Sequence, residues 1–248
     1  MSTYLGQNFL IDTKVKQYIK DIVAKYKYRY NISNCIEIWP GKWAITKLIY
    51  TVFWSNLKVI EKDITMADHI SFLNDKQIIW WDILDYQANK WDKDSLVYWS
   101  LPYYITSPII GKFFVENKYK YGIFIVQKER AEKVQTIATK KSYLWWLLNN
   151  NYTIELSKTI KPKSFNPPPK IDSAIVKITY HGTNYIDHNT LQLVLDKISW
   201  YKRKTIGKIL KILWYDLDDI KISDIGIYKK RLEQLDWDDM NTICKIVK

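Results

Sequence analysis

Residues Glu37–Thr46, which read E-I-W-P-G-K-W-A-I-T, decide the fold of this chain. They follow a short apolar run that opens at Cys35 and precede an amphipathic stretch, so we expect a turn between a buried strand and a helix. With glycine at 39 and 43 the stretch would read E-I-G-P-G-K-G-A-I-T. Such a turn binds nucleotide-like cofactors, because glycine permits positive φ and lets the backbone approach a ligand.

The tryptophan and glycine contents of the chain also suggest that glycine belongs at some of the tryptophan positions. There are 12 Trp but only 7 Gly in 248 residues. In an average protein, about 7% of the residues are glycine. We hypothesise that the gene uses the codon UGA for glycine and that a reading of UGA as tryptophan produced the printed sequence. The alternative is a genuinely tryptophan-rich protein. The codons at 39, 43, 81 and 99 distinguish the two.

Length and charge limit the class of protein. A chain of 248 residues suits one large domain, or one domain with a small appendage. A hydrophobic content of 47% beside 26% charged residues is typical of a soluble globular protein. The net charge of +12 favours a polyanionic partner, most economically nucleic acid. A lysine-rich genome would give the same excess, so the charge alone does not decide this.

Disulfide, zinc, secretory and membrane classes are disfavoured. Cys35 and Cys244 are too few for a disulfide framework or a zinc site, and Cys35 is expected in the core. Residues Met1–Asp12 lack the features of a signal peptide. No apolar run reaches the length of about 18 residues that a membrane span needs. We therefore expect a cytoplasmic protein that makes no use of a membrane.

Short apolar runs alternate with longer amphipathic stretches, as in an α/β sheet. Asp12 can cap a first helix. Further helices are expected near Ala44–Phe53, Met66–Asn74, Pro108–Asn117 and Glu129–Thr139. Seven strands, which predict a doubly wound sheet, are expected over Cys35–Trp39, Lys58–Glu61, Ile78–Trp81, Leu96–Trp99, Gly122–Gln127, Tyr152–Leu156 and Ala174–Tyr180.

The pattern changes after Tyr180. Strand signals stop there, His181–Tyr185 reads as a linker, and helical periodicity begins at about Asn189. We expect an α/β domain over residues 1–180 and a small helical domain over residues 181–248.

Other motifs lie beside the expected strand ends. Glu61 ends the second strand, where an acid can accept both ribose hydroxyls of a nucleoside cofactor. Residues 81–84 (W-D-I-L) end the third strand and residues 99–104 (W-S-L-P-Y-Y) end the fourth. Residues 6–10 (G-Q-N-F-L) precede the first helix.

In this order the motifs resemble the ribosomal RNA adenine N6,N6-dimethyltransferase family, bacterial enzymes that dimethylate two adjacent adenines near the 3′ end of small-subunit rRNA. The family pattern runs G-Q-N-F-L, E-I-G-P-G-x-G-x-L-T, G-D-x-L and G-N-L-P-Y-Y, and Trp39, Trp43 and Trp99 stand where it carries glycine. Further matches are V-Q-K-E at 126–129, F-N-P-P-P-K-I-D-S-A at 165–174 and R-K-T at 203–205. The resemblance covers the chain from residue 5. It implies a Rossmann-like, seven-stranded methyltransferase sheet with a small all-helical C-terminal domain.

The resemblance also implies S-adenosylmethionine as the cofactor, bound over the carboxyl ends of strands one to four. Glu61 would hold the ribose, Asp82 would accept from the adenine amine, and Ile83 would pack on the adenine ring. Taken alone, Glu61 or Asp82 could equally be an ordinary solvated strand end. The full cofactor set implied is Gln7, Asn8, Leu10, Glu37, Trp39, Gly41, Glu61, Asp82, Ile83 and Ser100.

The segment that begins at Ser100 is expected to hold the target adenine. The Ser100 hydroxyl and the Leu101 carbonyl would accept from its exocyclic amine and stabilise the positive charge that grows on nitrogen. Pro102 would fix the turn, and Tyr103 would offer a stacking face, with a place in the core as the alternative for Tyr103. By resemblance Phe165 is a second aromatic of this pocket, with a packing role as the alternative. Ser100 stands where the family usually has asparagine, which puts the rate of methyl transfer in doubt. The resemblance implies no metal ion.

Basic residues of the helical tail, Lys202, Arg203, Lys204 and Lys208, are expected to bind rRNA, with a merely solvated face as the alternative. The expected partner is small-subunit rRNA in an immature subunit, and the enzyme is expected to be a monomer. There are three alternative functions. A catalytically inactive assembly factor would have its cofactor site filled by Trp39 and Trp43. The large-subunit antibiotic-resistance methyltransferases are disfavoured by the 165–174 block and the 202–205 tail. A dinucleotide oxidoreductase would have no use for the 100–104 segment.

Overall fold

The computed structural model describes residues 8–65, 72–83, 85–86, 93–100, 105–215 and 226–247. Most of the helix expected over Met66–Asn74 lies outside these residues. The contacts within the chain form two compact units. Unit 1 comprises Met1–Ala131 and Ile154–Tyr180, and unit 2 comprises Glu132–Thr153 and His181–Lys248. One boundary therefore falls at the expected position after residue 180, while Glu132–Thr153, expected in the first domain, belongs with the C-terminal unit.

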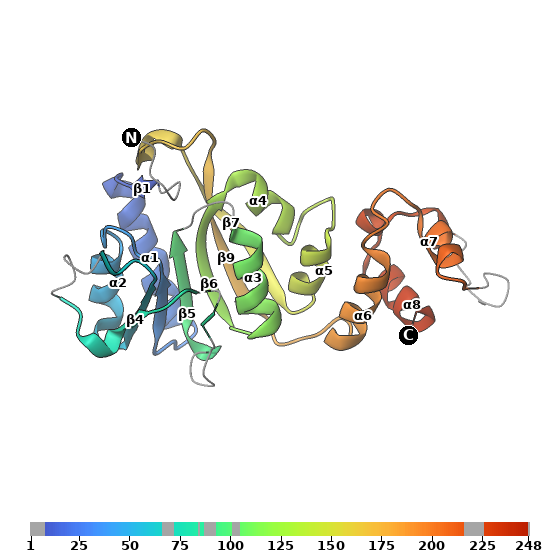
Figure 1. The fold of residues 1–248 in the computed structure, drawn as a ribbon, viewed down its shortest axis with the longest axis horizontal. Coiled ribbons are helices and arrows are strands. Elements are labelled where there is room, and N and C mark those ends of the chain that lie inside the picture. Colours follow the sequence, from blue (N-terminus) through green and yellow to red (C-terminus); the bar gives the residue numbers. More distant parts are fainter. Residues whose placement is uncertain are drawn as a thin grey trace. The chain divides into compact units, whose positions relative to one another are not determined.

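Unit 1 is built on a seven-stranded sheet with strand order β4-β3-β2-β5-β6-β9-β7 (Figure 1). Strands β2 to β6 pair in parallel, and β9 is antiparallel to β6. The expected Rossmann-like sheet is confirmed, although β7 runs four residues beyond its expected end. The strands are β2 (Cys35–Ile38), β3 (Leu57–Glu61), β4 (Ile78–Trp80), β5 (Leu96–Ser100), β6 (Tyr121–Gln127), β7 (Tyr152–Ile160) and β9 (Ser173–Tyr180).

Helices α1 (Thr13–Arg29) and α2 (Thr46–Phe53) bury their apolar faces in one hydrophobic cluster with alternate residues of the sheet. Ile19 and Ile49 are fully buried there, as is Cys35, which confirms its expected core position. Helix α1 begins where it does because the Asp12 carboxylate accepts from the backbone N–H groups of Lys14 (3.0 Å) and Val15 (3.2 Å).

The other face of the sheet contacts α3 (Thr106–Ile110) and the π-helical turn Gly111–Glu116 that continues it. The rings of Phe114 and Phe124 meet edge to face at 5.6 Å. Because successive strand residues point to opposite faces, the near-continuous apolar runs of β5 and β6 fill both layers. Helix α4 (Lys128–Val134) follows β6 directly.

A two-stranded pair, β1 (Phe9–Leu10) with β8 (Phe165–Asn166), was not expected from the sequence. Neighbouring bonds extend it. The Ile11 N–H donates to the Ser164 carbonyl (2.8 Å), and the Ser164 hydroxyl donates to Asp12 Oδ2 (2.9 Å). This pair fixes the segment just before α1 against residues 164–166.

Unit 2 contains α5 (Tyr143–Asn149), α6 (His188–Ile198), α7 (Ile206–Ile212) and α8 (Trp237–Ile246). The helical character expected after about Asn189 is confirmed, whereas α5 was not expected. The rings of Trp145 and Trp237 stack at 5.8 Å, which joins α5 to α8.

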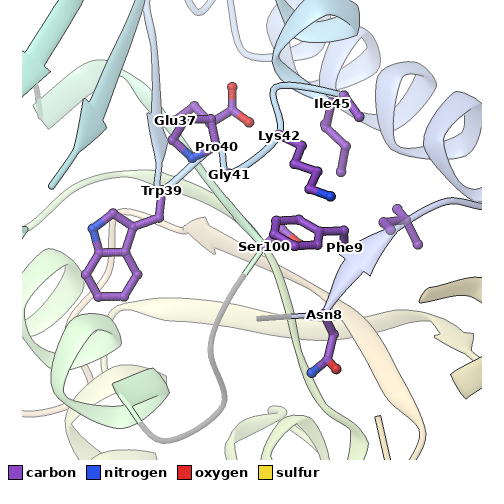
Figure 2. Close-up of a pocket in the computed structure, with 11 residues that line it drawn as sticks. Asn8, Phe9, Glu37, Trp39, Pro40, Gly41, Lys42, Ile45 and Ser100 are labelled. Carbon is purple, nitrogen blue, oxygen red and sulfur yellow. The ribbon is translucent and has the colours of Figure 1, made fainter. Parts of the chain in front are cut away.

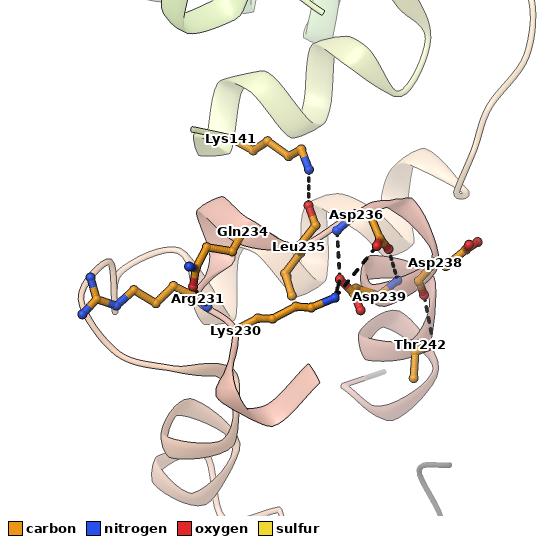
Figure 3. Close-up of polar contacts among 9 residues, drawn as sticks. All are labelled: Lys141, Lys230, Arg231, Gln234, Leu235, Asp236, Asp238, Asp239 and Thr242. Carbon is orange, nitrogen blue, oxygen red and sulfur yellow. Dashed lines mark hydrogen bonds and ion pairs between the residues drawn. The ribbon is translucent and has the colours of Figure 1, made fainter. Parts of the chain in front are cut away.

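Figure 3 shows the polar contacts that accompany this packing. The Lys141 ammonium donates to the Leu235 carbonyl, and Lys230 Nζ lies 2.7 Å from Asp239 Oδ2. The Asp236 carboxylate accepts from the Asp239 N–H (2.9 Å), which caps α8. The Lys141–Leu235 bond and the Trp145–Trp237 stack explain why Glu132–Thr153 belongs with the C-terminal unit. No helix among the described residues is long and apolar enough to cross a membrane.

Candidate active site

The candidate site lies where β2 and β5 run side by side and the strand order of the sheet reverses. Ile38 pairs with Trp99 at this point. The chain leaves β2 at Trp39 and ends β5 at Ser100. Ligands of open α/β sheets bind in the crevice outside the carboxyl ends of the strands at such a switch point.

One pocket opens at this edge (Figure 2). It brings together six of the residues predicted to bind the cofactor: Asn8, Leu10, Glu37, Trp39, Gly41 and Ser100. Sequence reasoning did not name the other lining residues, which are Phe9, Pro40, Lys42, Ala44 and Ile45. All five lie inside the motifs at residues 6–10 and 37–46, so assigning each whole motif to the site would have predicted them.

Strand β1 closes over the turn that follows β2. Gly41 has φ +60°, and a Cβ built on it would lie 3.1 Å from Phe9 Cε1. The Lys42 ammonium lies 4.7 Å from the centroid of the Phe9 ring. Glycine is therefore favoured at 41 both by its backbone conformation and by the close approach of Phe9.

Glu61 is buried at the end of β3. Its Oε1 accepts from the backbone N–H groups of Lys62 (2.8 Å) and Asp63 (2.9 Å). Burial raises the pKa of this carboxyl, while the N–H groups of Asp63, Lys62 and Gly41 oppose the rise. The carboxylate is thus held in one orientation beside the glycine turn.

Glu37 is the second buried acid of the site. Burial raises its pKa to about 8, the nearby Thr46 hydroxyl opposes the rise, and the charge of Glu61 adds to it. Its Oε2 has no hydrogen-bond partner among the described residues. Buried polar atoms are normally paired, so this oxygen is suited to accept from a donor that enters the pocket.

The structure places two more predicted residues at the end of β4. Asp82 Oδ2 lies 2.7 Å from Lys62 Nζ, so a cofactor amine would share this acceptor with a lysine. Ile83 is fully buried.

Four described residues that were predicted for the site do not line the pocket, namely Glu61, Asp82, Ile83 and Phe165. Phe165 lies in β8, is only 4% exposed and belongs to the hydrophobic cluster of α1 and α2, which matches its alternative packing role. Gln7, Leu101, Pro102 and Tyr103 lie outside the described residues. The four basic residues of the tail are exposed on unit 2. Within the described part of the chain, no group of three or more His, Cys, Asp or Glu residues could hold a metal ion.

The polar groups of the site suit a nucleoside cofactor, but the available space does not. The cavity measures about 70 Å³, whereas small-molecule sites usually enclose about 300–1,000 Å³. The indoles of Trp39 and Trp99 meet edge to face at 5.9 Å at the switch point. Their Nε1 atoms are buried and have no partner among the described residues. Each such donor costs about 1–3 kcal/mol.

Comparison with known proteins decides the family. The sequence model of the ribosomal RNA adenine dimethylase family matches this chain over residues 1–248. The chain belongs to this family. Its members are S-adenosylmethionine-dependent methyltransferases, and this chain is therefore an rRNA adenine dimethylase.

Two relatives agree with this assignment, and both are called ribosomal RNA small subunit methyltransferase A. The protein of Malacoplasma penetrans is 30% identical over 225 residues, which cover 85% of this chain and 78% of the relative. The protein of Coxiella burnetii is 30% identical over 236 residues, which cover 86% of this chain and 85% of the relative.

Solved structures support the fold of the dimethylase. A dimethyladenosine transferase from Plasmodium falciparum has a TM-score of 0.70 at 20% identity and covers 95% of each chain. The 23S rRNA methyltransferase ErmE has a TM-score of 0.63 at 15% identity, and the match covers 97% of this chain and 99% of that one.

Proposed function

We propose that this dimethylase methylates the N6 amines of two adjacent adenines near the 3′ end of small-subunit rRNA, in an immature subunit. The observation that carries the proposal is the pocket at the β2/β5 switch point, which Glu37, Gly41 and Ser100 line together in a chain that matches the family from end to end. The small-subunit substrate is supported by the names of the relatives and by the 165–174 and 202–205 motifs.

The acids of the site would hold the cofactor. When bound, S-adenosylmethionine supplies an electrophilic methyl group. Glu61, with one oxygen held by backbone N–H groups, would accept from the ribose hydroxyls. The unpaired oxygen of Glu37 would accept from a donor on the methionine portion. Asp82 and Ile83 would serve the adenine ring, with Lys62 beside the Asp82 carboxylate.

Ser100 would act on the target base. Its hydroxyl would accept from the adenine N6 amine, together with the Leu101 carbonyl, and stabilise the charge that develops on nitrogen. Tyr103 would stack on the base, which must leave its own stack to reach the pocket. Phe165, paired with Leu10 across β1 and β8, is better placed to position β1 over the pocket than to touch the base.

The exposed basic residues of unit 2 would bind rRNA phosphates, namely Lys202, Arg203, Lys204 and Lys208. We further propose that the enzyme acts in the cytoplasm, as a monomer and without a metal ion.

A second candidate function is a catalytically inactive rRNA-binding assembly factor. The small cavity and the two touching indoles favour it. It requires that tryptophan is the true residue at 39.

Removal of the Ser100 hydroxyl tests the catalytic role. Ser100→Ala should slow methylation of immature small subunits by about tenfold or more, while calorimetry shows little change in cofactor affinity. Ser100→Asn should keep or raise the rate. Ser33→Ala, at an exposed serine, is the matched control. An unaltered rate for Ser100→Ala would exclude the proposed contact. Mass spectrometry of the RNA should show dimethyladenosine, and product confined to large-subunit RNA would contradict the proposed substrate.

A further inference from the structure

Tryptophans occupy backbone conformations that favour glycine at four places in the described chain. Six non-glycine residues have positive φ, and four of them are Trp, although only 12 of the 248 residues are Trp. Positive φ brings Cβ close to the carbonyl oxygen, so bulky residues are genuine outliers in this region. The four are Trp39 (φ 49°), Trp43 (φ 58°), Trp54 (φ 50°) and Trp214 (φ 64°).

Trp214 follows Leu213, the C-cap residue of α7, and so occupies the position at which helices most often carry glycine. Its N–H donates to the Lys211 carbonyl (3.1 Å), and the N–H of Tyr215 donates to the Leu210 carbonyl (3.0 Å). These two bonds define the Schellman motif at the end of α7, whose left-handed position is usually glycine. The indole is 95% exposed. The backbone conformation therefore comes from helix termination and not from packing of the side chain.

Trp54 ends α2 in a still less permissive conformation. Its φ of 50° and ψ of −126° correspond to the first central position of a type II′ turn, which is dominated by glycine. The Trp54 N–H donates to the Tyr50 carbonyl, which fixes the residue at the helix end. The side chain is 61% exposed.

Trp39 and Trp43 flank Gly41 in the turn after β2. The Trp39 N–H donates to the Ile60 carbonyl (2.9 Å), and the Trp43 N–H donates to the Pro40 carbonyl (3.2 Å). Their surroundings differ completely from those of Trp54 and Trp214, because Trp43 is fully buried and Trp39 lines the pocket. The backbone conformation is the property that all four share.

We propose that the protein made in the cell carries glycine at 39, 43, 54 and 214. Positions 54 and 214 lie outside every family motif, so the backbone there supports the codon hypothesis independently of the resemblance. Trp81 and Trp99 have negative φ, and the backbone adds nothing to that hypothesis at these two positions. One consequence rests on the proposed function: glycine at 39 removes an indole from the switch-point crevice and enlarges the cofactor pocket.

Peptide mass spectrometry of the protein isolated from its source cells tests the proposal directly. Peptides that contain positions 39, 43, 54 and 214 should carry glycine, and the gene should read UGA at these codons. Tryptophan in any of these peptides would overturn the proposal at that position. The readout does not depend on methyl transfer, so failure of the proposed function would leave it unchanged.

A matched pair of variants of the printed chain tests the backbone argument. Trp214→Gly and Trp200→Gly both remove an exposed indole, since Trp200 is 83% exposed, but only Trp214 has positive φ. Trp214→Gly should raise the thermal midpoint by about 2–4 °C, and Trp200→Gly should leave it unchanged or lower it. Equal shifts for the two variants would overturn the assignment of glycine at 214.

Discussion

Helices α1 and α7 end in the same backbone conformation, but different residues adopt it. After α1, Asn31 has φ 51°, and the N–H of Ile32 donates to the Lys27 carbonyl (2.9 Å). After α7, Trp214 has φ 64° and the equivalent bond runs from Tyr215 to Leu210. Asparagine tolerates the left-handed conformation and tryptophan does not. The α1 end shows what this backbone normally requires, and the α7 end departs from it.

The turn after β2 has the same conflict in a buried setting. At the end of α7 the exposed indole leaves only the backbone strained. In the β2 turn Trp39 also lines the pocket, and its indole meets that of Trp99 edge to face. The same substitution is therefore expected to change binding in one region and only stability in the other.

The largest expected effect comes from Trp39→Gly. It should raise the affinity of the purified protein for S-adenosylmethionine by at least about 100-fold, or about 2.8 kcal/mol, because it relieves the backbone and vacates the crevice. Isothermal titration calorimetry measures this, with Trp200→Gly as the control. Equal affinity in the printed chain and the variant would show that the Trp39 indole does not obstruct the site.

Glu37→Gln tests the buried region, because Glu37 is a buried acid of β2 just before the turn. Burial raises the pKa of Glu37 from 4.5 to about 8, so the folded protein retains a proton that the unfolded chain loses as the pH rises above 4.5. The stability from this proton is fully present below about pH 4.5 and is lost as the pH rises through about 8. Between pH 5 and 9 the free energy of unfolding should fall on the order of 2 kcal/mol more in the parent than in Glu37→Gln.

Urea denaturation across this pH range measures the difference. Burial also raises the pKa of Glu61, which contributes a loss of the same sign in both proteins. Glu129→Gln, at an exposed carboxyl on α4, is the control and should keep the pH dependence of the parent. A Glu37→Gln variant with the parent's dependence would contradict the assignment to Glu37.

The smallest expected effect comes from exchanging residues at the end of α1. Asn31→Trp should lower the free energy of unfolding by about 1 kcal/mol, because it recreates the situation of Trp214. Asn31→Gly should be neutral or slightly stabilising. If Asn31→Trp is as stable as the parent, tryptophan is tolerated in this backbone and the comparison between the two helix ends loses its force.

The sequence predicted much of the fold because the signals are local. Apolar runs placed the seven strands, and Asp12 gave the start of α1 through a bond to a backbone only three residues away. The motifs gave Glu37, Gly41 and Ser100 as site residues, and parallel strands then bring their carboxyl ends to one edge. The pairing of Phe165 with Leu10 was not predicted, because the two residues lie far apart in the sequence.

By itself the sequence determined the alternation of strands and helices, the family, and the turn proposed to bind the cofactor, since each depends on the order of residues within a short stretch. Only the tertiary structure decided that Glu132–Thr153 belongs with the C-terminal unit, that β1 pairs with β8, and that Trp54 and Trp214 have positive φ. The first two depend on contacts between distant segments. The φ values at 54 and 214 depend on how the chain leaves a helix. A glycine at these positions would have indicated positive φ in the sequence, whereas a tryptophan does not.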